Sequence, residues 1–210
     1  MSDGKYHLVL LAAVLLVLLW SGINPHDYFT WVLEVLPALI AMAILAAVYK
    51  RFRFTRLVYT LAALHMMILI VGGHYTYAEV PLFDWIKEAF NLSRNHYDRV
   101  GHLAQGFIPA IVAREVLLRV TTLKPGKMLF FIVVCICLAF SAFYELIEWW
   151  VAVATGTAAD AFLGSQGDVW DSQWDMFMCM LGSIASQLIF SRLHDRQLAP
   201  ILNQEREADA

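Results

Sequence analysis

Six long apolar runs, each close to the length that crosses a lipid bilayer, constrain the fold of this chain more than any other feature. They cover residues 6–23, 28–48, 57–71, 100–118, 128–153 and 173–190. A hydrocarbon core of ~30 Å is spanned by ~20 apolar residues in an α-helix, which satisfies its own backbone hydrogen bonds. Hydrophobic residues make up 60% of the 210 residues and charged residues only 16%. We therefore predict an all-α, polytopic membrane bundle of about six transmembrane helices.

Two segments outside the apolar runs have patterns of their own. Between the third and fourth runs, Leu82, Trp85, Ile86 and Phe90 recur at helical spacing among charged residues, which predicts a short interfacial helix near residues 82–92. After the sixth run the chain becomes strongly charged. We therefore interpret residues 1–197 as a single integral membrane domain and residues 198–210 as a charged, mobile C-terminal tail.

Basic residues are concentrated in connections that lie on one side of the membrane if both termini share that side. Twelve of the 15 Lys and Arg residues then fall there: Lys5, Lys50, Arg51, Arg53, Arg56, Arg114, Arg119, Lys124, Lys127, Arg192, Arg196 and Arg206. Only Lys87, Arg94 and Arg99 remain on the other side. Because Lys and Arg accumulate in cytoplasmic loops, this distribution predicts that both termini are cytoplasmic.

Acidic and histidine side chains recur near the outer ends of three predicted helices. The pairs, each three or four residues apart, are Asp98 with His102, Glu145 with Glu148, and Asp171 with Asp175. That spacing places both members of a pair on one helix face. His102, Glu145 and Asp175 lie 17 or 18 residues from the basic residue that closes each helix, or about 25–27 Å at ~1.5 Å per residue. Because ionisable groups in a membrane bundle avoid lipid, we expect them to meet at one depth in the outer leaflet.

Such a cluster has three possible explanations. Carboxylates that are buried together repel one another, so they must share protons or a cation. A divalent metal is the first explanation, with His96, Asp98, His102, Glu145 and Asp175 as candidate ligands. Glu148 or Asp171 would then be the general base of an enzyme that activates water. The alternatives are a non-catalytic binder or permease component, and a proton-shared carboxylate cluster that only fixes helix packing.

Several neighbouring residues are candidates for supporting roles. His74, at the end of the third apolar run, is either a further ligand or an interfacial histidine. Arg99 and Asp168 are candidate ion partners, and Tyr144 precedes Glu145 directly. Trp149 and Trp174 flank the acidic residues, where an aromatic belt at the membrane surface is favoured over a wall that stacks on substrate.

Other functional classes find no support in the sequence. The basic residues form short loop clusters rather than a face, so we expect no nucleic-acid partner. Cys135, Cys137 and Cys179 all lie inside apolar runs, which favours packing roles over a disulfide framework or a zinc knuckle. The chain also lacks a Gly-rich phosphate loop and the Ser-x-x-Lys and Gly-x-Ser-x-Gly motifs of serine hydrolases.

Three motifs carry a family resemblance that spans nearly the whole chain. They are His-Tyr-Asp-Arg-x-x-His from His96, Tyr-Glu-x-x-Glu-Trp from Tyr144 and Trp-Asp-x-x-x-Asp-Met from Trp170. The set resembles the YjdF family of bacterial inner-membrane proteins, which implies the same location for this chain.

A more distant similarity is to the VanZ-like membrane proteins linked to glycopeptide-antibiotic resistance. Their pattern of Asp-Lys-x-x-His, Glu and Asp implies a polar site at Asp98, His102, Glu145 and Asp175, with Arg99 in place of the Lys. His96, Glu148, Asp168 and Asp171 depart from that pattern. For an enzyme at the outer leaflet, we expect a lipid-linked or phosphorylated substrate from the cell envelope.

Overall fold

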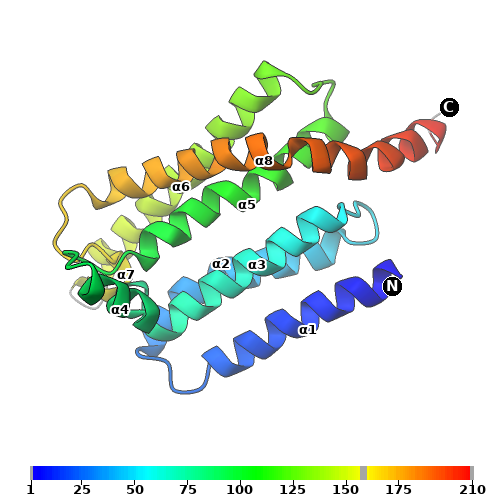
Figure 1. Ribbon diagram of the computed structural model, residues 1–210. Coiled ribbons are helices and arrows are strands. Elements are labelled where there is room, and N and C mark those ends of the chain that lie inside the picture. The colour runs from blue at the N-terminus through cyan, green and yellow to red at the C-terminus, as the bar shows by residue number, and fades with distance from the viewer. Residues whose placement is uncertain (1, 157–159, 209–210) are drawn as a thin grey trace.

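The computed structural model describes residues 2–156 and 160–208, and every regular element in these ranges is helical (Figure 1). The elements are α1 (Asp3–Ser21), α2 (Tyr28–Val48), α3 (Arg56–Tyr75), the 3-10 turn η1 (Tyr77–Glu79), α4 (Pro81–Ala89), α5 (Tyr97–Val120), α6 (Lys127–Thr155), α7 (Asp160–Leu163) and α8 (Asp171–Ala208). The prediction of an all-α chain is confirmed.

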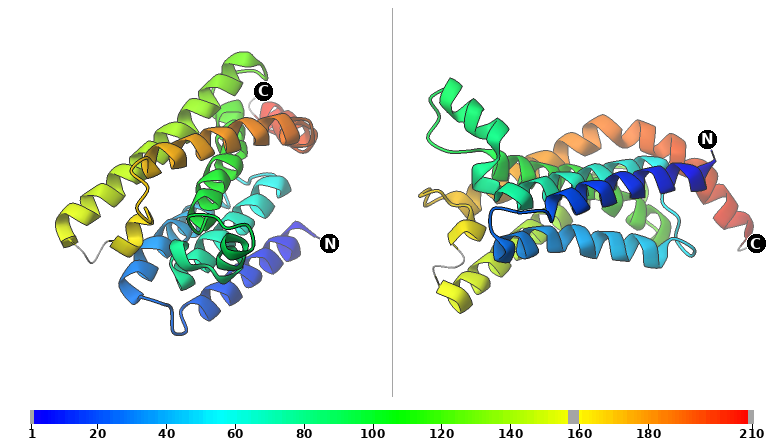
Figure 2. Two further views of the ribbon diagram at one scale, coloured as in Figure 1. Left: turned by 60° about the vertical axis from the view of Figure 1, so that its left-hand side comes forward. Right: turned by 90° about the horizontal axis from the view of Figure 1, so that it is seen from below.

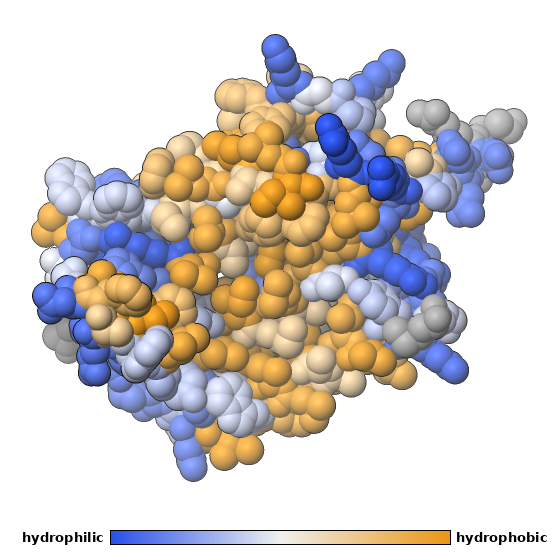
Figure 3. All heavy atoms as spheres, in the orientation of Figure 1, coloured by the Kyte–Doolittle hydropathy of each residue, from blue (hydrophilic) through white to orange (hydrophobic). Residues whose placement is uncertain are grey.

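Five of these helices, α1, α2, α3, α6 and α8, are long and apolar enough to cross a membrane. The sixth long helix, α5, has 24 residues but carries charged side chains toward both of its ends. Between Val100 and Ala113 it contains no Asp, Glu, Lys or Arg. The molecular surface has the corresponding pattern, since a broad apolar belt separates two hydrophilic ends (Figure 3). The chain is therefore a polytopic helical membrane bundle, as predicted.

The polar helix α5 lies inside the bundle. It packs most extensively against α8, and it also contacts α3 and α6 (Figures 1 and 2). Helices α1 and α2 both pack on α3, at the opposite side from α8. This arrangement separates the charged ends of α5 from lipid, which removes most of the cost of placing them in a membrane protein.

Helices α5 and α8 touch through small residues. A Cβ atom added to Gly106 would lie 1.8 Å from the carbonyl oxygen of Cys179, and one added to Gly182 would lie 2.1 Å from that of Leu103. Small residues let membrane helices approach at backbone distance and gain dispersion contacts. The thiols of Cys137 and Cys179 are buried at the same contact, in agreement with packing roles. The register of α5 against α8 is thus fixed in the first half of each helix.

The bundle has two chemically distinct ends (Figure 1). We call the end with the start of α1 and the end of α8 the basic end; it also holds the connections at residues 49–55 and 121–126. The opposite, acidic end holds α4, α7 and the first turns of α5 and α8. Helix α4 has no buried residue, and Leu82, Trp85 and the following Phe90 are exposed, as expected of a helix that lies on a membrane surface.

The C-terminal part of the chain differs from the expectation of a mobile tail. Helix α8 does not end near residue 190 but runs unbroken for 38 residues to Ala208, past the boundary drawn at residue 197. Leu198 is buried, and Glu205 forms an ion pair with Arg119 of α5. Charged composition alone suggested a solvated segment, because the sequence did not show that α5 offers this segment a partner.

Candidate functional site

The start of α5 is fixed by a buried asparagine at the acidic end. The side-chain amide of Asn95, which is fully buried, donates to the carbonyl oxygen of Val80 at 3.1 Å and to a carboxylate oxygen of Asp84 at 2.9 Å. Its side-chain oxygen accepts from the backbone N–H of Tyr97 at 3.0 Å, a local turn that begins the helix. These bonds tie α5 to α4 and set the position of Asp98.

The loop between α7 and α8 covers the first turn of α5. Gln166 brackets the backbone of Asn95, because its side-chain oxygen accepts from the Asn95 N–H and its amide donates to the Asn95 carbonyl, both at 2.9 Å. Gly164, with φ of +62°, lies directly against Asp98, where an added Cβ would be 3.3 Å from Oδ2. Glycine is needed there for both the left-handed backbone and the close approach.

Two arginines hold the acidic residues nearest this loop. The side chain of Arg94 is buried and forms an ion pair with Asp171, while also lying 3.5 Å from Asp98 and 3.8 Å from Asp168. Arg99 pairs with Asp168 at 2.5 Å. The backbone N–H of Trp170 and, with a smaller effect, the guanidinium of Arg99 hold the pKa of the Asp168 carboxyl below its usual range. This outer layer therefore contains two guanidinium groups and three carboxylates.

A second layer lies one turn deeper, around His102. The Nε2 atom of His102 is 3.6 Å from Asp98 Oδ1 and 3.7 Å from Glu145 Oε1. One ligand atom each from Asp98, His102 and Asp175 lies within 4.8 Å of the others, and so do one each from His102, Glu145 and Glu148. Three helices, α5, α6 and α8, thus bring four carboxylates to a single imidazole.

The deeper layer lacks compensating charge. In the described ranges, no Lys or Arg forms an ion pair with Glu145, Glu148 or Asp175. Glu145 Oε1, Asp175 Oδ1 and His102 Nδ1 are buried without a hydrogen-bond partner among these residues. The two layers together hold six carboxylates against two arginines. Because buried like charges repel, the arrangement requires protons or a cation.

Two candidate histidines, one a predicted ligand and one a predicted supporting residue, lie outside both of these groups. His96 is the residue before the first turn of α5, and burial, followed by Arg99 and Arg94, lowers the pKa of its imidazole. His74 bonds through Nδ1 to the carbonyl oxygen of Ser21 at 2.9 Å and stacks on Trp20 with ring centroids 4.4 Å apart. His74 therefore joins α1 to α3 and does not contact the carboxylates that surround His102.

The predicted aromatic residues have different environments. The ring centroid of Tyr144 is 6.3 Å from that of His102, so Tyr144 lies beside the cluster. Trp149 is 57% exposed, which favours the membrane belt. Trp174 is also largely exposed, but its ring lies 5.1 Å from the guanidinium carbon of Arg99. It therefore stacks on the outer layer through a cation–π contact.

Arg94 and Asn95 are the site residues that the sequence analysis missed. The sequence placed Arg94 among the few basic residues of the outer connections. Its position four residues before Asp98 is the feature that could have indicated their ion pair. Asn95 carried no such signal, because its partners Val80 and Asp84 are brought to it only by the fold.

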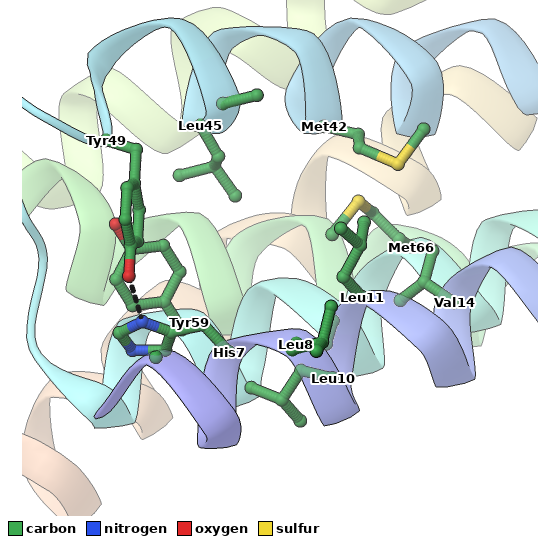
Figure 4. Close-up of a pocket in the computed structure, with 13 residues that line it drawn as sticks. His7, Leu8, Leu10, Leu11, Val14, Met42, Leu45, Tyr49, Tyr59 and Met66 are labelled. Carbon is green, nitrogen blue, oxygen red and sulfur yellow. Dashed lines mark hydrogen bonds between the residues drawn. The ribbon is translucent and has the colours of Figure 1, made fainter. Parts of the chain in front are cut away.

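Two cavities between the described helices differ in size and in their lining residues. A groove of about 370 Å³ lies between α1, α2 and α3, lined by aliphatic side chains such as Leu11, Val14 and Met66 (Figure 4). Its polar groups are confined to one end, where His7 Nδ1 bonds to the Tyr49 hydroxyl at 2.8 Å. A smaller cavity of about 60 Å³ adjoins His102 and Tyr144. The large groove suits hydrocarbon, so the candidate site is the cluster beside the small cavity.

The fold and the buried cluster define a class: a polytopic helical membrane protein with an acidic, histidine-containing centre at one end. The chain belongs to the family described as "Predicted membrane protein (DUF2238)", which it matches over residues 6–196. It is also 50% identical over 183 residues to "Inner membrane protein YjdF" of Escherichia coli (strain K12), covering 87% of this chain and 88% of that protein. No solved structure matches the chain. The resemblance to the YjdF family is confirmed, and the protein is a multi-pass protein of the inner membrane.

Proposed function

We propose that the cluster binds a divalent metal ion at the periplasmic face of the inner membrane and uses it to hydrolyse, or transfer a group on, a lipid-linked or phosphorylated substrate. The observation that carries this proposal is the convergence of four carboxylates on His102, three of them without a Lys or Arg partner in the described part of the chain. A bound cation would remove their repulsion and use the buried oxygens that have no hydrogen bond.

The distances and the donor types favour a transition metal. Two ligands at ~2.0–2.2 Å from one ion lie no more than ~4.4 Å apart. The 3.6 Å and 3.7 Å separations of His102 Nε2 from Asp98 and Glu145 fall within that limit. Asp175 forms one group with Asp98 and His102, and Glu145 and Glu148 form a second group with His102. Both are mixed imidazole and carboxylate groups, which suit Zn, Mn or Fe better than Mg or Ca. His96 lies outside both groups, and a role for it needs movement of the first turn of α5.

The remaining groups suggest a division of labour. When bound, the metal would supply an activated water. Glu148 is buried beside His102 and Glu145 and is free of ion pairs in the described ranges, so we assign it as the general base. Asp171 is engaged by Arg94 and holds that guanidinium in place. Arg94 and Arg99, whose Nε atoms lack partners among the described residues, are suited to a phosphate group.

The orientation is part of the proposal, with both termini cytoplasmic and the acidic end periplasmic. It is supported by the basic residues of the connections that lie at the basic end. A membrane-impermeant thiol reagent should label Ser165→Cys in cells whose outer membrane is permeable. Arg192→Cys should react only after the inner membrane is opened. The reverse pattern would contradict the proposed side of the site.

A proton-shared structural cluster is the second candidate, and the closed loop at residues 164–170 favours it. That loop and the bundle leave His102 and Asp175 only 4% and 2% exposed. Metal analysis of the purified protein separates the two candidates. The metal proposal expects a bound divalent ion that is lost in His102→Ala and retained in His74→Ala, because His74 lies outside the cluster. A metal-free parent after purification in metal-supplemented buffer would favour the structural cluster.

A further inference from the structure

The small cavity beside the cluster gathers polar atoms that have no partner. His65 of α3, Tyr77 of η1, and His102 and Gln105 of α5 all line it. Each has a buried polar atom without a hydrogen bond among the described residues: Nε2 of His65, the hydroxyl of Tyr77, Nδ1 of His102 and Oε1 of Gln105. Buried polar groups are nearly always satisfied in native proteins, so four such atoms around one space point to a small polar ligand of this cavity.

The backbone holds these atoms in place around the cavity. The ring of Tyr77 lies between two glycines, since a Cβ on Gly72 would be 2.0 Å from Cε1 and one on Gly101 would be 3.6 Å from Cε2. The N–H of Tyr77 also donates to Glu34 Oε1 at 3.3 Å. The cavity is therefore not a gap into which the tyrosine can simply collapse.

We propose that this cavity binds ordered water that links Nδ1 of His102 to Gln105, Tyr77 and His65. Its volume of about 60 Å³ exceeds the ~10–15 Å³ that one ordered water requires. An ordered internal water makes two to four hydrogen bonds, and the four unpartnered atoms supply that number. Water fits this cavity because it both donates and accepts hydrogen bonds and is small enough for the space.

The water would give the two ring nitrogens of His102 separate tasks, an extension that rests on the proposed metal site. Nε2 faces Asp98 and Glu145, so a metal-ligating His102 must carry its proton on Nδ1. Ligating histidines almost always donate that second N–H to an acceptor, which fixes the tautomer and the ring. The cavity water, held by Gln105 and Tyr77, is this acceptor, and both residues are positioning residues for His102.

A density map of the metal-free protein at a resolution that shows ordered water tests the first step. We expect at least one water within hydrogen-bonding distance of both His102 Nδ1 and Gln105 Oε1. We expect it to be lost or displaced in Gln105→Leu. A dry cavity, or a direct hydrogen bond from His102 to Gln105 with the cavity closed, would overturn the proposal whether or not the protein binds a metal.

Metal affinity tests the second step. Gln105→Leu and Tyr77→Phe should each weaken binding of added Zn²⁺ or Mn²⁺ by about 10–100-fold, as loss of an outer hydrogen-bond partner does. Tyr97→Phe is the matched control, because its hydroxyl donates to the Ile68 carbonyl at 2.7 Å and does not line the cavity. Unchanged affinity in both variants would refute the link to ligation. A parent that binds neither ion would refute the proposed function. The ordered-water proposal would then be decided by the density map alone.

Discussion

Helix α5 carries a buried cluster of charged and histidine side chains at each of its ends. At the basic end the centre is Glu115, which is fully buried. Its carboxylate accepts from the backbone N–H of Thr55 at 3.0 Å, the Thr55 hydroxyl at 2.7 Å, Arg119 at 3.2 Å and His194 Nε2 at 3.0 Å. At the acidic end, the carboxylates around His102 have no comparable set of donors.

The two buried histidines show the same contrast. At the basic end, Arg114 lies 2.6 Å from His194 Nδ1, and because an arginine only donates, Nδ1 accepts and Nε2 carries the proton given to Glu115. Arg114 also pairs with Asp195 at 2.7 Å. At the acidic end, His102 Nε2 stays beyond hydrogen-bonding distance of its nearest carboxylate oxygens, and Nδ1 has no partner in the described ranges.

This difference separates two uses of buried charge in one membrane bundle. A network whose donors and acceptors match is complete and fastens α3, α5 and α8 together. A network with excess carboxylates and unpaired atoms is complete only with something added. Burial of charge therefore does not by itself distinguish the two ends, whereas the excess of carboxylates at the acidic end does.

The largest effect should come from breaking the complete network. Glu115→Ala would leave the donors of Thr55, Arg119 and His194 buried without their acceptor, at a cost of about 3–5 kcal/mol in the free energy of unfolding. Thermal or denaturant-induced unfolding in detergent measures this change in the free energy of unfolding. Glu205→Ala is the control, since its partly exposed ion pair with Arg119 contributes about 0–1 kcal/mol. Equal stability of Glu115→Ala and the parent would show that the Glu115 network does not stabilise the packing of α3, α5 and α8.

A smaller loss should follow from separating the helices that assemble the acidic cluster. Gly106→Val places side-chain atoms against the Cys179 backbone and should cost about 1–3 kcal/mol through overpacking. It should also reduce metal content, because Asp175 moves with α8 away from His102. Gly4→Ala is the matched control, with nothing within 4 Å of the added atom. Parent-like metal content in a destabilised Gly106→Val protein would contradict the coupling of this contact to the site.

The smallest effect concerns the outer layer and pH. The pKa of Asp168 is lowered by the Trp170 N–H and by Arg99, so its contribution to stability is present above the ordinary Asp pKa of ~3.9 and is lost as pH falls through the lowered value. Asp168→Asn should therefore be slightly less stable than the parent at neutral pH, and the difference should shrink at strongly acidic pH. Melting temperatures of both proteins across pH measure this. A difference in melting temperature that grows as the pH falls would contradict this prediction.

Helical geometry explains why much of the bundle and the centre of the site could be predicted from the sequence. Apolar run length gave the spans, and three- or four-residue spacing at equal depth brought Asp98, His102, Glu145 and Asp175 together. Arg94 and Asn95 lie in irregular chain before α5, where position depends on contacts with Val80, Gly164 and Asp171. Such contacts between distant segments leave no periodic signal.

The extent of α8 could not be predicted for a related reason. A charged segment is expected to be solvated unless its partners are known. Here the partners are Arg114 and Arg119 of α5, which pair with Asp195 and Glu205. For His74 the sequence left two alternatives open, because its depth did not show that it faces α1, where it contacts Ser21 and Trp20.

The most direct test of the account measures metal content and thermal stability together in the parent, Glu145→Gln and Asp175→Asn. Glu79→Gln is the control, because Glu79 is exposed and pairs with His26 outside the cluster. We predict a divalent ion in the parent and in Glu79→Gln, loss of that ion in the two cluster variants, and a lower melting temperature for both in metal-containing buffer. A metal-free parent whose Glu145→Gln and Asp175→Asn variants are at least as stable would contradict the metal centre. The stability of the amide variants would then be explained by relief of carboxylate repulsion alone.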